Sequence, residues 1–191
     1  MLFRSGAIRH AHAALAHGRD DAIALSWGGF NIGMVEHDRG AAREAFEAAL
    51  ALSPSSGITY LLGGMVLGLA GEAERAIEWG KRGQRLSPLD PFGHTGWHGM
   101  FLGYFQQGGY EDATSAARKA IQVNPGFSIS YMFLAGALAR AGHIDEAKTA
   151  ASRVLALQPN FSIGEWCAAV DPVPAIAEPL AEALSAAGLP E

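Results

Sequence analysis

Apolar side chains recur along most of this chain with the three-to-four-residue period of amphipathic helices. The most apolar run, Ile58 to Ala70, has this period too, and it is shorter than the roughly 20 residues that cross a bilayer. Glycines recur inside these helical patterns and do not gather as in a linker, which predicts helices that pack closely. The pattern as a whole predicts an all-α chain.

Four prolines end segments of similar sequence, and their spacing reveals an internal repeat. The segments are Ala-Leu-Ser-Pro54, Arg-Leu-Ser-Pro88, Gln-Val-Asn-Pro125 and Ala-Leu-Gln-Pro159. Successive prolines are 34, 37 and 34 residues apart. Because proline stops a helix, each period is expected to hold one helical hairpin.

Positions between the prolines repeat as well. An aromatic residue lies in each first helix, at Tyr60, Trp97 and Tyr131. A glycine turn follows at Gly71, Gly108 and Gly142, and a small residue begins the second helix at Ala76, Ala113 and Ala147. Small residues let two helices approach, and aromatic rings fill the space between them. One hairpin cannot bury its apolar face alone, so the hairpins must stack.

These features resemble the tetratricopeptide repeat family over roughly residues 22–160. The resemblance implies a right-handed α-solenoid of antiparallel helix hairpins with a C-terminal capping helix, forming a single domain over residues 1–191. The expected units are a half-hairpin helix at 5–20, repeats at 22–54, 57–88, 94–125 and 128–159, and a C-terminal cap at 160–191.

The first repeat and the two ends depart from this pattern. The turn at 36–40 lacks the standard glycine and is about one residue short. In repeat phase, the first helix is the second half of a hairpin, which indicates either a piece of a longer protein or a native N-terminal cap. Pro179 is expected to break the C-terminal cap, with a closing helix at 180–187.

Three segments extend the resemblance to a particular group of proteins. The closing Ala186–Glu191, together with Arg85–Pro91 and Gly108–Ala113, resembles the C-terminal region of certain bacterial proteins. In these, a class III adenylate/guanylate cyclase domain or a winged-helix DNA-binding domain precedes tetratricopeptide repeats. The resemblance implies a regulatory module, since the repeats leave no room here for the cyclase domain itself.

In this family the first helices line a concave groove, which implies a set of partner-contacting positions. Here these are Ile58, Leu61, Leu62, Met65, Leu69, His98, Leu102, Phe105, Gln106, Met132, Phe133 and Arg140. Only Arg140 is basic, which argues against a clamp for a peptide carboxylate. Met and Leu favour an apolar or amphipathic helix as the guest. The alternative is a groove already filled, by a tight superhelix, by a terminal helix or by a second copy of the chain.

Composition restricts the function further. The net charge is −5 and no Lys/Arg run exceeds two residues, which argues against direct binding of nucleic acid. Cys167 is the single cysteine, so no intrachain disulfide can form, and a reducing, cytoplasmic location is expected. The N-terminus is a poor secretory signal, and we expect no membrane association.

No pattern of catalytic or cofactor-binding residues is recognisable, and we expect neither enzyme activity nor a cofactor. His94 and His98 are spaced as two metal ligands on one helix face, but only Asp90 is near as a third, so no metal is expected. The sequence therefore predicts a non-catalytic scaffold for a protein or peptide partner, or for another domain of its parent chain. A regulatory module of a larger cyclase and a homodimerisation module are the alternatives.

Overall fold

The computed structural model describes the backbone of residues 2–191 and the side chains of residues 6–191, so Met1 of the predicted domain lies outside the described residues. Within this range the chain is helical throughout and contains no strand. The elements are α1 (Leu2–His17), α2 (Ala22–Asn31), the π-helix η1 (Ile32–Glu36), α3 (Arg39–Leu52), α4 (Gly57–Leu69), α5 (Ala73–Leu86), α6 (Gly93–Gln106), α7 (Tyr110–Val123), α8 (Ser128–Arg140), α9 (Ile144–Leu157), α10 (Ile163–Val170) and α11 (Pro174–Ala186).

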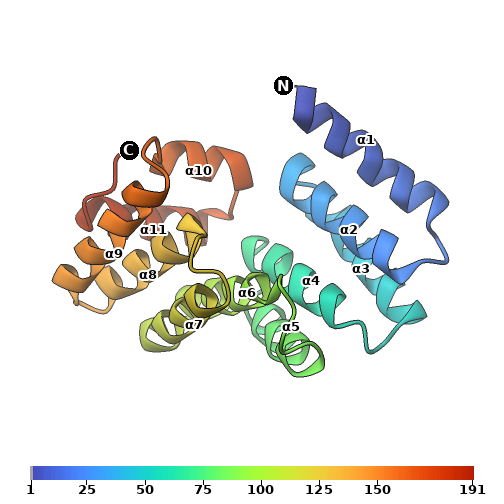
Figure 1. The fold of residues 1–191 in the computed structure, drawn as a ribbon, viewed down its shortest axis with the longest axis horizontal. Helices are drawn as coiled ribbons and strands as arrows, with labels where there is room; N and C mark the ends of the chain where they lie inside the picture. Colours follow the sequence, from blue (N-terminus) through green and yellow to red (C-terminus); the bar gives the residue numbers. More distant parts are fainter. Residues whose placement is uncertain (1) are drawn as a thin grey trace.

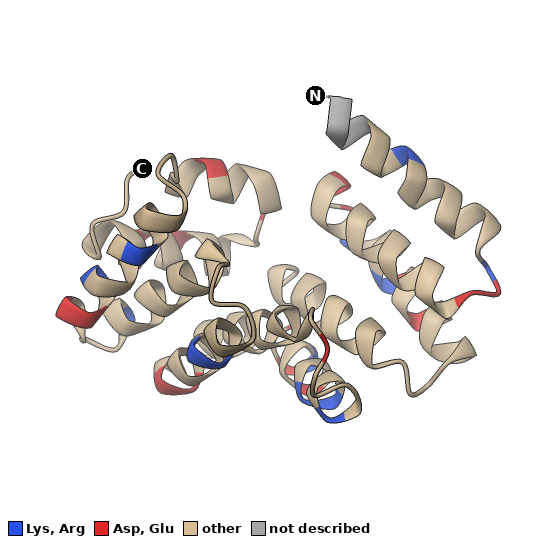
Figure 2. Cartoon of the chain, in the orientation of Figure 1, with Lys and Arg blue, Asp and Glu red and all other residues tan. Residues whose placement is uncertain are grey.

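The helices form hairpins that follow one another around an arch (Figure 1). Helices α2, α4, α6 and α8 form the inner layer, and α3, α5, α7 and α9 form the outer layer. Charged residues lie mainly on the outer helices, whereas α2, α4 and α6 carry no Asp, Glu, Lys or Arg (Figure 2). The arch is therefore apolar inside and charged outside.

The turns have the stereochemistry that the repeated glycines and prolines impose. Gly71, Gly108 and Gly142 have φ of 85°, 75° and 85°, the left-handed conformation that ends a helix cheaply only at glycine. Each repeated proline follows a helix cap with φ between −139° and −137°. These caps lie outside the helical region because the ring of the next proline disfavours helical backbone before it.

The first hairpin forms the same left-handed turn without a glycine. Eight residues separate Gly29 from His37, whereas seven separate Gly64 from Gly71, and both glycines pack against the second helix of their hairpin. The π-helix η1 absorbs the additional residue. His37, with φ of 62°, takes the left-handed place of the turn glycine. The prediction of a short turn was wrong: the helix before the turn is longer.

Glycines inside the inner helices allow close packing. A Cβ at Gly99 of α6 would lie 2.5 Å from the carbonyl carbon and 2.6 Å from the carbonyl oxygen of Gly64 in α4. Only glycine fits such a contact, because real Cβ atoms do not approach backbone this closely. The prediction that these glycines serve helix packing is confirmed here.

A cation lies over an aromatic ring at one repeat position of three successive hairpins. The cation belongs to the second helix and the ring to the first. Arg82 lies 4.7 Å from the Tyr60 ring, Lys119 lies 4.8 Å from Trp97, and Arg153 lies 5.9 Å from Tyr131. The aromatic positions of the repeat therefore fasten the outer helix to the inner one as well as filling space.

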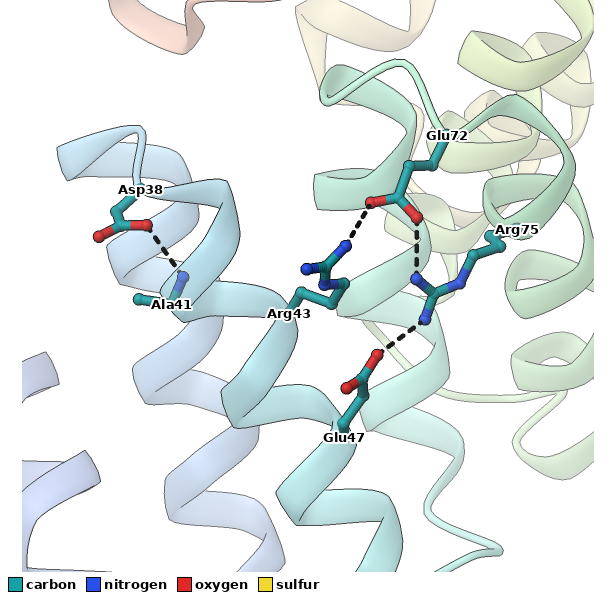
Figure 3. Close-up of polar contacts among 6 residues, drawn as sticks. All are labelled: Asp38, Ala41, Arg43, Glu47, Glu72 and Arg75. Carbon is teal, nitrogen blue, oxygen red and sulfur yellow. Dashed lines mark hydrogen bonds and ion pairs between the residues drawn. The ribbon is translucent and has the colours of Figure 1, made fainter.

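An ion-pair network joins the first hairpin to the second (Figure 3). Arg75 of α5 lies 2.8 Å from a carboxylate oxygen of Glu72 and 3.2 Å from one of Glu47, which belongs to α3. Arg43 lies 3.8 Å from the other Glu72 oxygen. Nearby, Asp38 caps α3 by accepting the backbone N–H of Ala41 at 2.9 Å.

The C-terminal cap consists of α10 and α11, and the predicted break at Pro179 does not occur. Proline inside a helix costs about 3 kcal/mol. Ile176, Leu180 and Leu184 lie one turn apart and are fully buried, and each contributes about 1.5–3 kcal/mol. Their burial outweighs the proline, so one helix runs from Pro174 to Ala186.

Candidate partner-binding face

The predicted groove residues all lie on the inner helices α4, α6 and α8. Three of them remain accessible to some degree: Ile58, Gln106 and Arg140. The other nine are buried: Leu61, Leu62, Met65, Leu69, His98, Leu102, Phe105, Met132 and Phe133. We call these twelve residues the inner face. An open groove lined by all twelve is therefore not what the chain forms.

The C-terminal cap covers part of the inner face, at α8 and α6. Other positions are buried by packing between the hairpins: Leu61 lies against Gly83 and Gly96, and Leu102 lies against Gly68. The ring of Trp166 in α10 meets the ring of Phe133 edge-on, with centroids 5.9 Å apart. Leu180 of α11 fills the space above Gly136 of α8, where an added Cβ would overlap its Cδ1. Two of the alternatives that the sequence left open therefore apply: packing within the stack buries Leu61 and Leu102, and a terminal segment covers Phe133.

Helix α11 is amphipathic, and its orientation on the inner face follows from this. Its buried side carries Ile176, Leu180 and Leu184, while Glu178 and Glu182 are exposed. It packs mainly against α8 and α6, the inner helices of two successive hairpins. At the edge, the guanidinium of Arg140 lies 3.8 Å from a carboxylate oxygen of Glu182.

Hydrogen bonds to backbone carbonyls connect the cap to the first two hairpins. The N–H of Val173 donates to the carbonyl of Leu69 at the end of α4, at 3.1 Å. The guanidinium of Arg39 in α3 donates to the carbonyls of Gly33 and Val170, and to that of Asp171 at 3.4 Å. Burial lowers the pKa of Arg39 and the nearby Asp171 carboxylate opposes this, and the side chain stays charged as arginine does in proteins.

His98 of the inner face is fully buried beside His94. Its Nε2 forms a 2.8 Å hydrogen bond with the Oγ of Ser130, which links α6 to α8. Burial, with a smaller contribution from His94, lowers the pKa of His98 to about 3, so the ring is neutral near pH 7. His94 bonds the carbonyl of Pro91 through Nδ1. Within residues 6–191, no three His, Cys, Asp or Glu side chains converge as metal ligands would.

Several residues of this region were missed by sequence reasoning. Arg39, Trp166 and Val173 hold or form the cover of the inner face, and their contacts join segments far apart in the chain. The sequence contained one signal for α11, the helix that lies on the inner face. Ile176, Leu180 and Leu184 follow the four-residue spacing of a helix with one apolar side, which is hidden by the proline between them.

An arch of stacked helical hairpins with an apolar inner layer defines an α-solenoid repeat protein. Two segments of the sequence, residues 36–91 and 104–163, match family models described as tetratricopeptide repeat. The chain therefore belongs to the tetratricopeptide repeat family. The matches confirm the predicted repeat, and the structure confirms the all-α solenoid.

Solved structures of similar fold include two of MamA and one of YrrB. A crystal structure of MamA protein is 23% identical, with 82% of this chain and 83% of that chain covered and a TM-score of 0.60. MamA 41-end from Desulfovibrio magneticus RS-1 is 19% identical, with 82% and 86% covered and a TM-score of 0.63. YrrB, described as a TPR protein with an unusual peptide-binding site, is 17% identical, with 92% and 91% covered and a TM-score of 0.58. At these identities the likeness shows the fold alone.

No curated protein sequence is significantly similar to the chain. The resemblance to the repeat region of cyclases and winged-helix regulators finds no support in the family matches and stays a prediction. Among the helices of residues 2–191, none combines the length and the apolar character that a membrane span needs.

Proposed function

We propose that this chain is a non-catalytic scaffold whose inner face binds an apolar or amphipathic helix of a protein partner. The observation that carries the proposal is α11 itself. The inner face already accommodates an amphipathic helix, with Leu180 seated on Gly136 and the charged side of the helix directed to solvent. A helix docking its apolar side in a groove is a common mode of peptide recognition.

The composition of the inner layer supports this choice of guest. Helices α4 and α6 carry no charged side chain, so a charged peptide gains no partner there. Met65 and Met132 belong to the face, and methionine adapts its shape to different apolar surfaces. Tetratricopeptide repeats generally mediate protein or peptide binding, and YrrB, which shares the fold, is a TPR protein with a peptide-binding site.

Arg140 indicates one feature of the guest. It lies at the accessible edge of the face, where its guanidinium pairs with Glu182 of α11 and lies 5.3 Å from the Tyr110 ring. A partner helix bound in the place of α11 would meet the same cation. We therefore expect an acidic residue two positions from an apolar residue of the partner helix, as Glu182 is from Leu180 and Leu184 in α11.

The test is a selection of helical peptides from a display library, performed on the full chain. Selected peptides are expected to carry apolar residues at three- and four-residue spacing and to protect the backbone amides of α6 and α8 from hydrogen exchange. Arg140→Ala should weaken their binding by a factor of about two to five, as for an exposed ion pair. Arg85→Ala, an exposed arginine on the outer helix α5, is the matched control and should change nothing.

Two outcomes would contradict the proposal. One is protection confined to α7 and α9, where a separate apolar cavity of about 530 Å³ lies on the outer side, lined by Arg118, Tyr131, Leu138 and Arg153. The other is a selection with no apolar periodicity. Light scattering on the same sample tests the homodimer alternative, since a dimer that dissociates when peptide is added would make a second copy the natural guest.

A further inference from the structure

The C-terminal cap does not continue the solenoid. A further hairpin would stack on both helices of the last repeat, α8 and α9. Instead, α11 lies against α8 and α6, and α10 packs against α11 and η1 of the first hairpin. The cap thus turns back across the inner face and reaches the opposite end of the arch, as the red and blue helices in Figure 1 show.

Few contacts hold the cap to the far side of the arch. The hydrogen bonds among them run from Arg39 to the carbonyls of Val170 and Asp171 and from Val173 to Leu69, and α10 also packs against η1. A cavity of about 290 Å³ lies beside them, lined by His37, Leu69, Asp171 and Val173 among others. The pocket opens to solvent, and the Arg39 side chain lines it together with the connection between α10 and α11.

The connection between α10 and α11 is strained at Asp171. Its φ is 46°, in the left-handed region that non-glycine residues enter at a cost. Pro172 and Val173 follow before α11 begins at Pro174. Arg39 donates to the carbonyl of this residue, so it holds the connection at the point where the chain turns from α10 towards α11.

We propose that α10 and α11 form a displaceable latch over the inner face, held shut by Arg39, so that a partner helix binds only where the latch opens. This inference rests on the proposed function, because it concerns control of the same face. Opening uncovers Leu69, Phe133 and Gly136, which α10, α11 and their connection now cover. An attached segment competes at an effective concentration in the millimolar range, so it excludes guests of moderate affinity.

The experiment uses a labelled synthetic peptide of residues 172–191 as the probe, added to the full chain and followed by fluorescence anisotropy. Wild type should bind it weakly, because its own latch occupies the face. Arg39→Ala should bind it about tenfold more tightly, as charge-assisted hydrogen bonds to the latch are lost. Arg43→Ala is the matched control, an exposed arginine one turn along α3, and should stay within about twofold of wild type.

A second variant of the full chain opens the latch by changing the apolar side of α11. Leu180→Asp with Leu184→Asp should release α11, deprotect the amides of α6 and α8 in hydrogen exchange and give the tightest binding of the wild-type peptide. A peptide with the same two substitutions should not bind any chain. Protection of α5 and α7 should persist, because α11 packs mainly against the inner helices α8 and α6.

The outcomes separate the latch from the proposed function. If Arg39→Ala binds no better than Arg43→Ala, or if the double variant loses its whole cooperative fold, the cap is a structural part of the solenoid and the latch is overturned. The peptide selection on wild type then still decides the proposed function. If the double variant deprotects the face but binds neither the probe nor any selected helix, the proposed function fails and the latch inference falls with it.

Discussion

The Nε2 of His98 lies 2.8 Å from the Oγ of Ser130, and this bond joins two inner helices in a fully buried site. Because burial holds the pKa of His98 at about 3, the folded chain keeps this ring neutral where the unfolded chain, with a histidine pKa of about 6.5, protonates it. The unfolded state therefore binds more protons between pH 6.5 and 3. The free energy of unfolding should fall as the pH drops through that window, by up to about 1.4 kcal/mol per pH unit from His98.

Burial also lowers the pKa of His94, which adds to the loss in the same direction. His98→Gln retains a group that can bond Ser130 but does not titrate, so its stability should fall less steeply below pH 6.5. Urea unfolding followed by circular dichroism at several pH values from 7 to about 4 measures both slopes. Equal slopes for the two proteins would show that His98 is not the group responsible.

Two glycine-to-alanine substitutions should change the free energy of unfolding in opposite directions. Gly99→Ala places a Cβ against the Gly64 carbonyl, where only backbone movement makes room, and should destabilise the chain by about 1–3 kcal/mol. Gly164→Ala, on the exposed side of α10 with no atom near its Cβ, should stabilise it by about 0.5 kcal/mol, because alanine is the better helix former. Urea denaturation gives both values, and a neutral Gly99→Ala would refute the close approach of α4 and α6.

The cation–ring pairs predict that removing one cation lowers the free energy of unfolding by a modest amount. Arg82→Ala removes the cation 4.7 Å from the Tyr60 ring and should cost about 0.5–1 kcal/mol, the range for an exposed pair. Arg85→Ala, three residues along the same helix and also exposed, should stay within about 0.5 kcal/mol of wild type. The comparison is made by thermal and urea unfolding, and the idea fails if both substitutions have the same cost.

The network around Arg75 predicts a salt-dependent contribution. Arg75 pairs with Glu72 and Glu47 and lies 5.4 Å from the Trp79 ring, so Arg75→Ala should cost about 1 kcal/mol at low ionic strength. Arg43, with one longer pair, should matter less. Because these groups are partly exposed, the ion-pair part should shrink in about 1 M salt, where the screening length is about 3 Å. A cost independent of salt would assign the effect to packing on Trp79 alone.

The repeated part of the fold was predictable because its signals act over a few residues. The prolines force the caps before them out of the helical conformation, and Gly71, Gly108 and Gly142 are the residues that enter left-handed turns without strain. His37 shows the limit of such a signal. It takes the same left-handed turn without being glycine, because the π-helix before it places it there.

The candidate site was predictable only in part. The positions of the inner face follow from the repeat, and all of them lie on inner helices. The cover over Phe133 does not follow, because it comes from Trp166, in a segment that carries no repeat pattern. Leu180 reaches Gly136, and Arg39 reaches Val170, through contacts between residues 44 and 131 apart in the chain, and no local pattern pairs them.

The sequence by itself determined that this protein is a stack of helical hairpins with an apolar inner layer, since periodicity and the stereochemistry of proline and glycine are properties of short segments. Tertiary structure decided that α11 runs through Pro179 and that it lies on the inner face. Both outcomes depend on the burial of Ile176, Leu180 and Leu184 against other hairpins. The free energy gained by burying these three side chains exceeds the local cost of the proline. It is gained only once the arch has formed.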